Sequence, residues 1–372
     1  MKKQRMYIIF LTFAIFCLIS AGVVVAPSNG TSDCSESGSS QRLIGFRYQV
    51  TATVPVGSSP YGVAVNPMGT KVYVENWGSD NISVIDTTTN TITATVTVGD
   101  CPEGIAVTPD GTKVYVANVF SDTVSVIDTA TNTVTATVPV GSYPLGVAVD
   151  PAGTKVYVTS GGNVSVIDTT TNKVTATVKA GNEPIRVAVS PDGTKAYVAN
   201  QDYSNGTVSV IDTTTNKVTA TVKVGLISGG AIVSPDGSKV YVGNQNDNTD
   251  GSKVYVGNQN DNTVSVIDTT TNTITATVTV GEYPTVGAVS PDGSKVYVTN
   301  RGEKGNVSVI DTATNTVTAR VPVGNGPEGI AVSSDGKKVY VTNFLSDTVS
   351  VIEKIPLYES INTESDDGNA TN

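Results

Sequence analysis

The residues best suited to chemistry share one position that recurs along the chain, directly after a loop proline or its equivalent. Glu103 and Glu328 stand there, and two carboxyls could act as general acid and base, as glycosidases require. They belong to different sequence repeats, however, and carboxyls at a rim are more often solvated charges. We therefore predict no catalytic residues. The same position holds Tyr61, Leu145, Ile185, Gly229 and Thr285, and Arg186 follows one position later.

The chain contains no histidine. This excludes a Ser-His-Asp triad, an imidazole general base, and zinc, copper or haem ligated by histidine. Asn246, Asn248 and Asp250 begin a pattern like an EF-hand calcium loop, but its twelfth position is Gly257, where a bidentate Glu is required. The sequence therefore predicts no metal site and no cofactor, with only weaker calcium contacts at these residues left open.

A second group of candidates lies in connections that differ between repeats. Aromatic rings with a few charges suit stacking on sugars or holding a peptide. The alternative is that the rings only cover the ends of the strands. The group comprises Trp77, Phe120, Tyr203, Arg301 and Phe344, and with Tyr61, Glu103, Arg186 and Glu328 it forms the predicted ligand-binding set.

These positions recur because the chain is built from a repeat of about 42 residues. Each repeat contains four alternating, β-branched runs separated by Asp-Gly, Asn-rich or Val-Gly turns, which predicts four strands, called A to D in chain order. Four strands in this length are typical of a β-propeller blade. One tyrosine of strand B marks each copy: Tyr73, Tyr115, Tyr157, Tyr197, Tyr241, Tyr297 and Tyr340.

The two ends of the repeat array predict how the ring closes. The last strand C ends at Glu353 and no strand D follows it, whereas an unmatched strand D, residues 48–56, precedes the first strand A. We predict that this strand completes the last blade, because an open ring would expose sheet edges. The sequence thus predicts an all-β, seven-bladed β-propeller over residues 48–353, with four antiparallel strands per blade and an N-terminal closing strand.

The loops of a propeller alternate between its two faces. The A–B and C–D turns are nearly uniform among the repeats, as at Pro109-Asp110-Gly111 and Asp128, and turn geometry alone accounts for them. The D–A and B–C loops share the other face and differ from blade to blade. The residues after the loop proline should ring the mouth of the central channel on this face, and the B–C loop residues should lie further out. We therefore predict that binding occurs on this variable face.

Several strand-B runs lie beside PDG-type turns and SVID-type runs: VYVEN (72–76), VYVAN (114–118), AYVAN (196–200) and VYVTN (296–300 and 339–343). They resemble the YVTN-family β-propeller repeats of archaeal surface-layer and cell-surface proteins. The resemblance covers roughly residues 48–353 and implies a propeller at the cell surface, but it implies little chemistry, because propellers host many functions. Family members often carry further surface-layer domains, whereas residues 354–372 form a short acidic tail that we predict to be disordered.

Residues 236–249 recur without change as residues 250–263, which adds a second copy of strand B to blade five. Both copies cannot pair consecutively, because the extra reversal would invert every later strand, so one copy must be looped out. The turn at Ser234–Gly237 leads directly into the first copy. We therefore predict that Lys239–Asn244 is the paired strand, with exchange between the identical copies left open.

The N-terminus has the pattern of an export signal, since three cations precede an uncharged apolar run. That run is also long enough to span a bilayer. We predict that residues 1–26 are a cleaved signal peptide or a retained membrane anchor and that residues 27–47 are a Ser/Gly-rich linker, which places the propeller outside the cell or at its surface. A net charge of −10 argues against nucleic acid and favours other surface proteins or glycans as partners.

Six Asn-x-Ser/Thr sequons are candidate glycosylation sites in an exported chain, although a Thr-, Ser- and Asn-rich composition also generates sequons by chance. They are Asn29, Asn81, Asn163, Asn205, Asn306 and Asn369.

Two functional hypotheses follow. The first is a non-catalytic cell-surface propeller, similar to surface-layer proteins, that acts as a structural, adhesive, or protein- or glycan-binding module through its variable face. The alternative is an extracytoplasmic binder of small ligands, or a hydrolase or lactonase-like enzyme, at the channel mouth. The two differ in one observation, because an enzyme needs converging polar groups with perturbed pKa values.

Overall fold

The computed structural model describes residues 41–201, 206–224, 228–244 and 262–360. It divides into two compact units, of which residues 47–355 form the propeller and the remaining residues form the second. In the described ranges all regular structure is strand, and no helix there is long and apolar enough to cross a membrane.

Seven four-stranded antiparallel sheets form the blades. Blade one consists of β2 (Pro60–Val65), β3 (Lys71–Asn76), β4 (Asn81–Asp86) and β5 (Thr91–Thr97); blade two of β6 (Pro102–Val107), β7 (Lys113–Asn118), β8 (Thr123–Asp128) and β9 (Thr133–Pro139); blade three of β10 (Val147–Val149), β11 (Lys155–Ser160), β12 (Asn163–Asp168) and β13 (Lys173–Lys179). Blade four consists of β14 (Pro184–Val189), β15 (Lys195–Asn200), β16 (Thr207–Asp212) and β17 (Lys217–Lys223); blade five of β18 (Ser228–Val233), β19 (Lys239–Asn244), β20 (Thr263–Asp268) and β21 (Thr273–Thr279); blade six of β22 (Pro284–Val289), β23 (Lys295–Asn300), β24 (Asn306–Asp311) and β25 (Thr316–Pro322). Blade seven consists of β26 (Pro327–Val332), β27 (Lys338–Asn343), β28 (Thr348–Ser360) and β1 (Gln41–Pro55).

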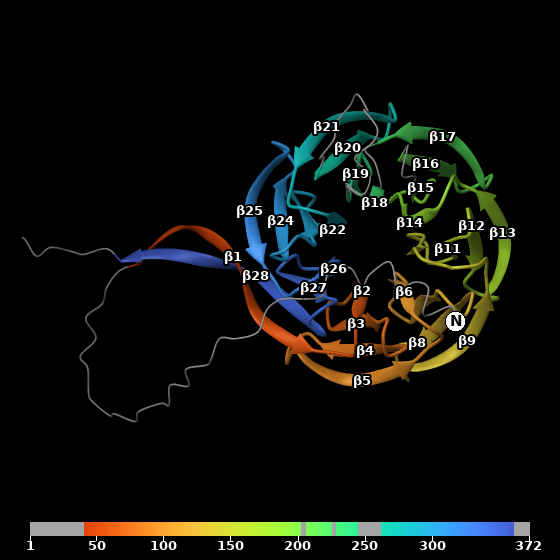
Figure 1. The fold of residues 1–372 in the computed structure, drawn as a ribbon, viewed down its shortest axis with the longest axis horizontal. Helices are drawn as coiled ribbons and strands as arrows, with labels where there is room; N and C mark the ends of the chain where they lie inside the picture. The colour runs from red at the N-terminus through yellow and green to blue at the C-terminus, as the bar shows by residue number, and fades with distance from the viewer. Residues whose placement is uncertain (1–40, 202–205, 225–227, 245–261, 361–372) are drawn as a thin grey trace, which may run out of the picture. The chain divides into compact units, whose positions relative to one another are not determined.

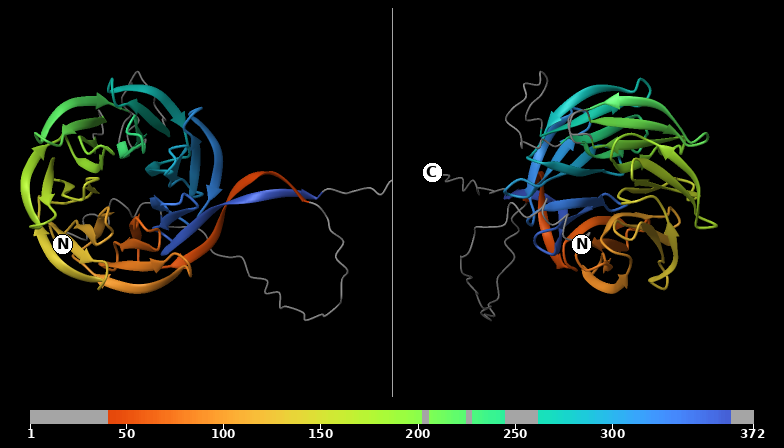
Figure 2. Two further views of the ribbon diagram at one scale, coloured as in Figure 1. Left: turned by 180° about the vertical axis from the view of Figure 1, so that it is seen from behind. Right: turned by 45° about the vertical axis from the view of Figure 1, so that its right-hand side comes forward.

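The blades follow one another around a central channel in chain order (Figure 1). The first strand of each blade lies nearest the channel and the fourth lies at the rim (Figure 1). The view from behind shows the same cyclic order (Figure 2). The predicted all-β, seven-bladed fold is confirmed.

The N-terminal strand closes the ring as predicted, because the last sheet has the order β1-β28-β27-β26. Thr51 Oγ1 donates to the main-chain oxygen of Val351 at 3.4 Å, and Val56 N donates to that of Asp347 at 3.0 Å. Val54 is 4% exposed and belongs to the same core cluster as Tyr340 of β27. The two ends of the chain therefore share one blade.

Both closing strands extend beyond the expected propeller bounds. β1 begins at Gln41, within the segment predicted to be a linker, and β28 continues to Ser360, within the predicted disordered tail. In the second unit these extensions lie in paired strands, and Arg42 Nη2 is 3.5 Å from Glu359 Oε2. Each extension supplies backbone partners for the other, which composition alone does not reveal. Residues 1–40 and 361–372, which hold the predicted signal or anchor and the end of the tail, lie outside the described residues.

The core lies between neighbouring blades. Tyr73 of blade one is fully buried in a cluster with Val114 and Ile127 of blade two, and the other core clusters likewise combine residues from adjacent blades. Both faces of strands B and C are therefore buried, which explains their nearly continuous apolar runs. The marker tyrosines of the repeat are thus packing residues.

The Asn of the strand-B motif orders the loops of the variable face. Asn118 Nδ2 donates to Ser125 Oγ at 2.9 Å, and Gly99 N donates to Asn118 Oδ1 at 3.1 Å. One amide thus connects strand B to strand C and to the loop that enters the blade. Asn300 repeats both bonds in blade six.

The opposite face is held by lysines that link blades. Lys71 Nζ donates to the main-chain oxygen of Thr129 in the next blade at 2.9 Å, and Lys155 does the same to Thr213. In blade six Lys295 instead pairs with Asp311 of its own blade at 2.6 Å. The uniform turns of this face therefore hold the ring together, as their regular sequence requires.

In blade five the first copy of the duplicated segment forms the strand. Lys239–Asn244 is β19, which pairs with β18 on one side and with β20 on the other. Residues 245–261, which hold most of the second copy, lie outside the described residues.

Candidate functional site

Side chains on the first strand of several blades are re-aimed at the channel mouth by irregular pairing. The register of β2 shifts between Pro60 and Val63, and β6, β14 and β26 shift at the same place. Such bulges locally disrupt the ladder and turn a side chain. Tyr61, Glu103 and Glu328 lie at these irregular starts.

The loops that enter these strands are fixed by a neighbouring blade. Ser59 N donates to Asp347 Oδ1 at 2.7 Å, and Cys101 N donates to Asp80 Oδ1 at 2.8 Å. Both residues have left-handed backbone angles, with φ of 53° and 54°. Hydrogen bonds to a carboxylate hold the backbone in this uncommon region and thereby fix the position of the next residues at the channel.

Six side chains from five blades then meet, and we call them the channel-mouth cluster: Tyr61, Glu75, Glu103, Arg186, Arg301 and Glu328. Arg186 Nη1 donates to the main-chain oxygen of Glu103 at 3.1 Å, and its guanidinium carbon is 5.5 Å from the centroid of the Tyr61 ring. The Tyr61 hydroxyl donates to the Glu103 carboxylate. Arg301 Nε lies 2.9 Å from Glu328 Oε1. The first strands thus bring together groups that lie far apart in the sequence.

Glu75 is the member that sequence analysis missed. It stands in β3, at a strand-B position where the other blades carry Ala117, Ala199 or a small equivalent, and it is fully buried. Its Oε2 packs on Gly62, where a Cβ would collide with it. The Gly62 N–H points to this carboxyl and lowers its pKa, but neither carboxyl oxygen makes a well-formed hydrogen bond. The only sequence signal was a carboxyl at a position that is otherwise small.

Burial raises the pKa of all three carboxyls in the cluster. It raises the pKa of Glu75 well above its usual value, with Glu103 adding to the effect and Arg186 opposing it. It raises the pKa of Glu328 to about 7, although Arg301 opposes it. The pKa of Glu103 is raised by burial and lowered in part by Arg186. Of the three, Glu328 therefore exchanges its proton near neutral pH, which a carboxylate in water does not do.

The aromatic and basic members of the cluster respond to the same environment. Burial, followed by the charges of Glu103 and Glu328, raises the pKa of Tyr61 well above 10. Burial alone would lower the pKa of Arg186, but Tyr61 and the three carboxyls raise it. Tyr61 is therefore a neutral phenol and Arg186 a permanent cation.

Two expectations about the variable face need correction. Glu328 is not a solvated rim charge, because it is 2% exposed and faces Arg301. Arg301 was placed further out with the B–C loop residues, yet its long side chain reaches inward to that carboxyl. The cost of a buried carboxylate without a partner explains this inward turn.

The predicted aromatic residues form a continuous row beside the cluster. The ring centroids of Tyr61 and Phe344 are 6.2 Å apart, those of Phe344 and Trp77 6.3 Å, and those of Trp77 and Phe120 6.5 Å. Tyr143 extends the row at 6.1 Å from Phe120 and is 47% exposed. These rings pack edge to face or tilted across blades seven, one, two and three. Tyr203 lies outside the described residues.

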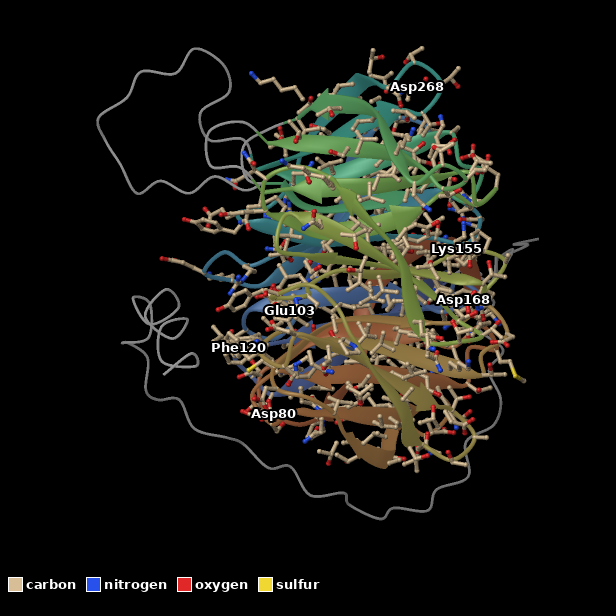
Figure 3. All side chains as sticks on the ribbon, turned by 90° about the vertical axis from the view of Figure 1, so that its right-hand side faces the viewer. Asp80, Glu103, Phe120, Lys155, Asp168 and Asp268 are labelled. Atoms are coloured by element: carbon tan, nitrogen blue, oxygen red, sulfur yellow. The ribbon has the colours of Figure 1, made fainter. Side chains whose placement is uncertain are left out.

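The two faces of the propeller differ as the loop analysis predicted. Figure 3 shows Glu103 and Phe120 toward one face, whereas Asp168 and Asp268 lie toward the other. On the second face each aspartate accepts bonds from its own turn, as when Thr171 N donates to Asp168 Oδ1 at 2.8 Å. The aspartates of that face therefore stabilise the turns in which they lie.

Three of the sequon asparagines can be placed. Asn81 Nδ2 donates to the main-chain oxygen of Ser79 at 2.9 Å, and Asn306 Nδ2 bonds to that of Lys304 in the same way. Asn163 makes a longer bond to Gly161 at 3.3 Å. Each amide thus already orders its own loop, and glycosylation stays a prediction. Asn29, Asn205 and Asn369 lie outside the described residues.

Other features of the described ranges offer weaker sites. A groove of about 700 Å³ at the edge of blades three and four is lined by Asn163, Lys179, Glu183 and Gln201, but its charged groups are exposed. Within the residues that the structure describes, no group of three or more Asp, Glu, Cys or His side chains is arranged to hold a metal ion. The channel-mouth cluster is therefore the strongest candidate site.

Comparison with known proteins gives two partial family matches. Residues 49–163 match the YNCE-like β-propeller family, and residues 250–370 match the cytochrome D1 haem domain. No curated protein matches the chain in sequence. Among solved structures, hydrazine synthase from Kuenenia stuttgartiensis is similar with a TM-score of 0.73 and 25% identity, over 79% of this chain and 95% of that one.

These matches correct the function that was predicted from sequence. They support a β-propeller with YNCE-like repeats, but none of them is to a surface-layer protein. A haem domain and an enzyme stand among them, so the prediction of a non-catalytic cell-surface module is wrong. The buried carboxyls with raised pKa values agree with this correction, because converging perturbed groups are what an enzyme needs.

Proposed function

We propose that this chain is a redox-class propeller that binds a small polar substrate at the channel-mouth cluster and exchanges protons with it. The observation that carries the proposal is the convergence of two buried carboxyls, Glu75 and Glu328, with the half-buried Glu103, two guanidinium groups and one phenol from five blades. The matches to a haem domain and to hydrazine synthase support the redox class.

The chemistry of the cluster assigns a role to each group. Glu328, with a pKa raised to about 7, donates or accepts a proton near neutral pH with little driving force lost. The Tyr61 hydroxyl, hydrogen-bonded to Glu103, forms a second donor and acceptor pair. Arg186 and Arg301 hold the carboxyls in place and stabilise negative charge that develops on a bound molecule.

The residues of this chain do not fit a haem at the cluster. Haem iron is held by His, Cys, Met or Tyr. The chain has no histidine, and Met68 lies in an A–B turn of the opposite face and is 80% exposed. Cys101 is fully buried in the loop that enters blade two, and burial of Tyr61 disfavours the phenolate that iron would need. Three carboxyls facing two guanidinium groups also disfavour haem propionates. The proposed role is therefore to hold the substrate and its protons, with the redox centre supplied by a partner.

Infrared titration and a turnover assay test the proposal together. We expect a carboxyl C=O band that titrates near pH 7 in the wild-type chain and disappears in Glu328→Gln. Turnover is assayed with artificial electron donors and acceptors, with and without added haemin. Hydrazine is the first compound tested, because the similar enzyme is named after it. We expect turnover to fall at least tenfold in Glu328→Gln and to be unaffected by Glu282→Gln, an exposed carboxyl on the same face.

Two results would overturn the proposal. One is the absence of any carboxyl that titrates above pH 6, which would mean that the cluster is an ordinary solvated charge network. The other is turnover that survives simultaneous replacement of Glu75, Glu103 and Glu328 by Gln, which would place the chemistry elsewhere. A Soret shift of added haemin that is lost in Tyr61→Phe would overturn the assignment of the redox centre to a partner.

A further inference from the structure

The channel-mouth cluster carries one negative charge too many when it is fully ionised. Glu75, Glu103 and Glu328 face Arg186 and Arg301, and Tyr61 stays neutral. Arg301 is committed to Glu328 by its ion pair, and Arg186 is shared between Glu103 and Glu75. Taking an uncompensated carboxylate out of water is costly. The cluster must therefore gain one proton or one small cation.

Glu75 is the place where that positive charge is missing. Its side chain is fully buried, and the Gly62 N–H that points to it makes no well-formed hydrogen bond, whereas Glu328 has the Arg301 ion pair and Glu103 has the Tyr61 hydroxyl. The groups that face it are Gly62 from β2, Glu103 from β6 and Arg186 from β14. The only cation among them is Arg186, which already serves Glu103.

The position of Glu75 in the repeat shows that packing does not require a carboxyl there. The equivalent residue is Ala117 in blade two, Ala199 in blade four and Thr342 in blade seven. In blade seven the Thr342 hydroxyl donates to the main-chain oxygen of Tyr61 at 2.6 Å. A small residue therefore fills the site without any buried charge, and Glu75 makes this one blade different.

We propose that the cluster binds a small monovalent cation with N–H donors, of the ammonium type, against the carboxylate of Glu75 in exchange for the proton that this group otherwise holds. This inference rests on the proposed function, because it names the class of ligand for the same site. Binding converts the neutral carboxyl into a carboxylate paired with the cation and releases one proton to solvent, so charge and protons balance.

The donor set explains the choice of cation. An N–H donor forms a directed, charge-assisted hydrogen bond to each carboxyl oxygen that lacks one. A metal ion would need several oxygen ligands in the right geometry, and in the described residues no group of three or more Asp, Glu, Cys or His side chains could hold one. An anion would meet three carboxyls and two arginines that are already engaged.

Isothermal titration calorimetry with ammonium chloride, at constant ionic strength and in buffers of different ionisation enthalpy, tests the inference. We expect the release of about one proton per cation, and an affinity that rises about tenfold per pH unit while Glu75 is protonated. Potassium chloride is the matched control, because potassium is a small monovalent cation without donors, and we expect at least tenfold weaker binding.

Three variants locate the site. Glu75→Gln keeps the shape and removes the charge, and Glu75→Ala copies the residue that blades two and four carry, so a folding failure of one leaves the other informative. Both should abolish ammonium binding, whereas Glu282→Gln on the same face should retain it. Binding that persists in both Glu75 variants would overturn the assignment.

The remaining outcomes separate this inference from the proposed function. Equal binding of potassium, or binding without proton release, would overturn the N–H cation while a carboxyl band titrating near pH 7 upholds the site. The absence of that band would remove the proposed function and this inference together.

Discussion

Arg186 of blade four lies over the ring of Tyr61 in blade one, with 5.5 Å between the guanidinium carbon and the ring centroid. The same guanidinium donates to the backbone of Glu103 in blade two, so one side chain spans the channel and joins three blades. A cation over an aromatic face is held by the ring quadrupole without consuming its N–H donors. Arg186 therefore remains able to act electrostatically on the carboxyls around it.

Replacing Arg186 should raise the pKa of its carboxyl neighbours. In Arg186→Gln we expect the pKa values of Glu75 and Glu103 to rise further, because the guanidinium lowers both. Infrared titration of the carboxyl bands measures this. Arg320→Gln is the control, since Arg320 lies on the outer strand of blade six and bonds there to Ser308. Bands that stay in place in Arg186→Gln would contradict the electrostatic role.

The raised pKa of Glu328 makes the stability of the propeller depend on pH. The folded carboxyl holds its proton up to about pH 7, whereas the unfolded one loses it near 4.5, so between these values the folded state binds more protons. The contribution of Glu328 to the free energy of unfolding is therefore greatest below about pH 4.5. It decreases by up to about 3 kcal/mol as the pH rises to about 7.

Denaturant unfolding of Glu328→Gln against wild type at several pH values measures this contribution. The variant should lose this part of the pH dependence in that window, because a neutral amide does not titrate. A wild-type stability that rises from pH 4.5 to 7, with the same slope in the variant, would show that Glu328 has an ordinary pKa.

The fold could be predicted because it is encoded seven times. Each blade needs only alternating strands, an Asp-Gly turn and the Asn that bonds two loops, and these local requirements leave a visible period. The closure of the ring followed from the unmatched strand at the N-terminal end and the missing strand at the C-terminal end. The extensions of β1 and β28 were missed because their pairing depends on two segments far apart in the chain.

The site could be predicted only in part, for the opposite reason: each of its residues occurs once. Tyr61, Glu103, Arg186 and Glu328 were placed at the channel mouth because their repeat position fixes where they point. Their burial depends on side chains from other blades, which no single repeat reveals. Glu75 was missed because it stands inside a strand motif that otherwise serves packing alone.

The closing strand should be essential to the propeller. A chain that starts at residue 57 lacks β1. The edge of β28 is then exposed, together with the core cluster around Tyr340 that Val54 of β1 otherwise completes. We expect its melting temperature to fall by about 10 °C or more, measured by circular dichroism. A chain that starts at residue 47 keeps the propeller part of β1 and serves as control, with an unchanged melting temperature. Equal melting of the two chains would show that blade seven does not need its fourth strand.

Removing residues 250–263 should leave the propeller intact. The deletion joins Thr249 to Val264, so Thr249 takes the place of Thr263, the partner of Asn244 in the β19–β20 pair. Residues 245–248 would then connect the strands with the same spacing as residues 77–80 in blade one and 119–122 in blade two. Because loop closure entropy grows slowly with length, we expect stability to be equal or higher by about 1 kcal/mol. Chemical denaturation of the two forms measures this, and a loss of several kcal/mol on deletion would mean that the second copy contributes to the folded structure.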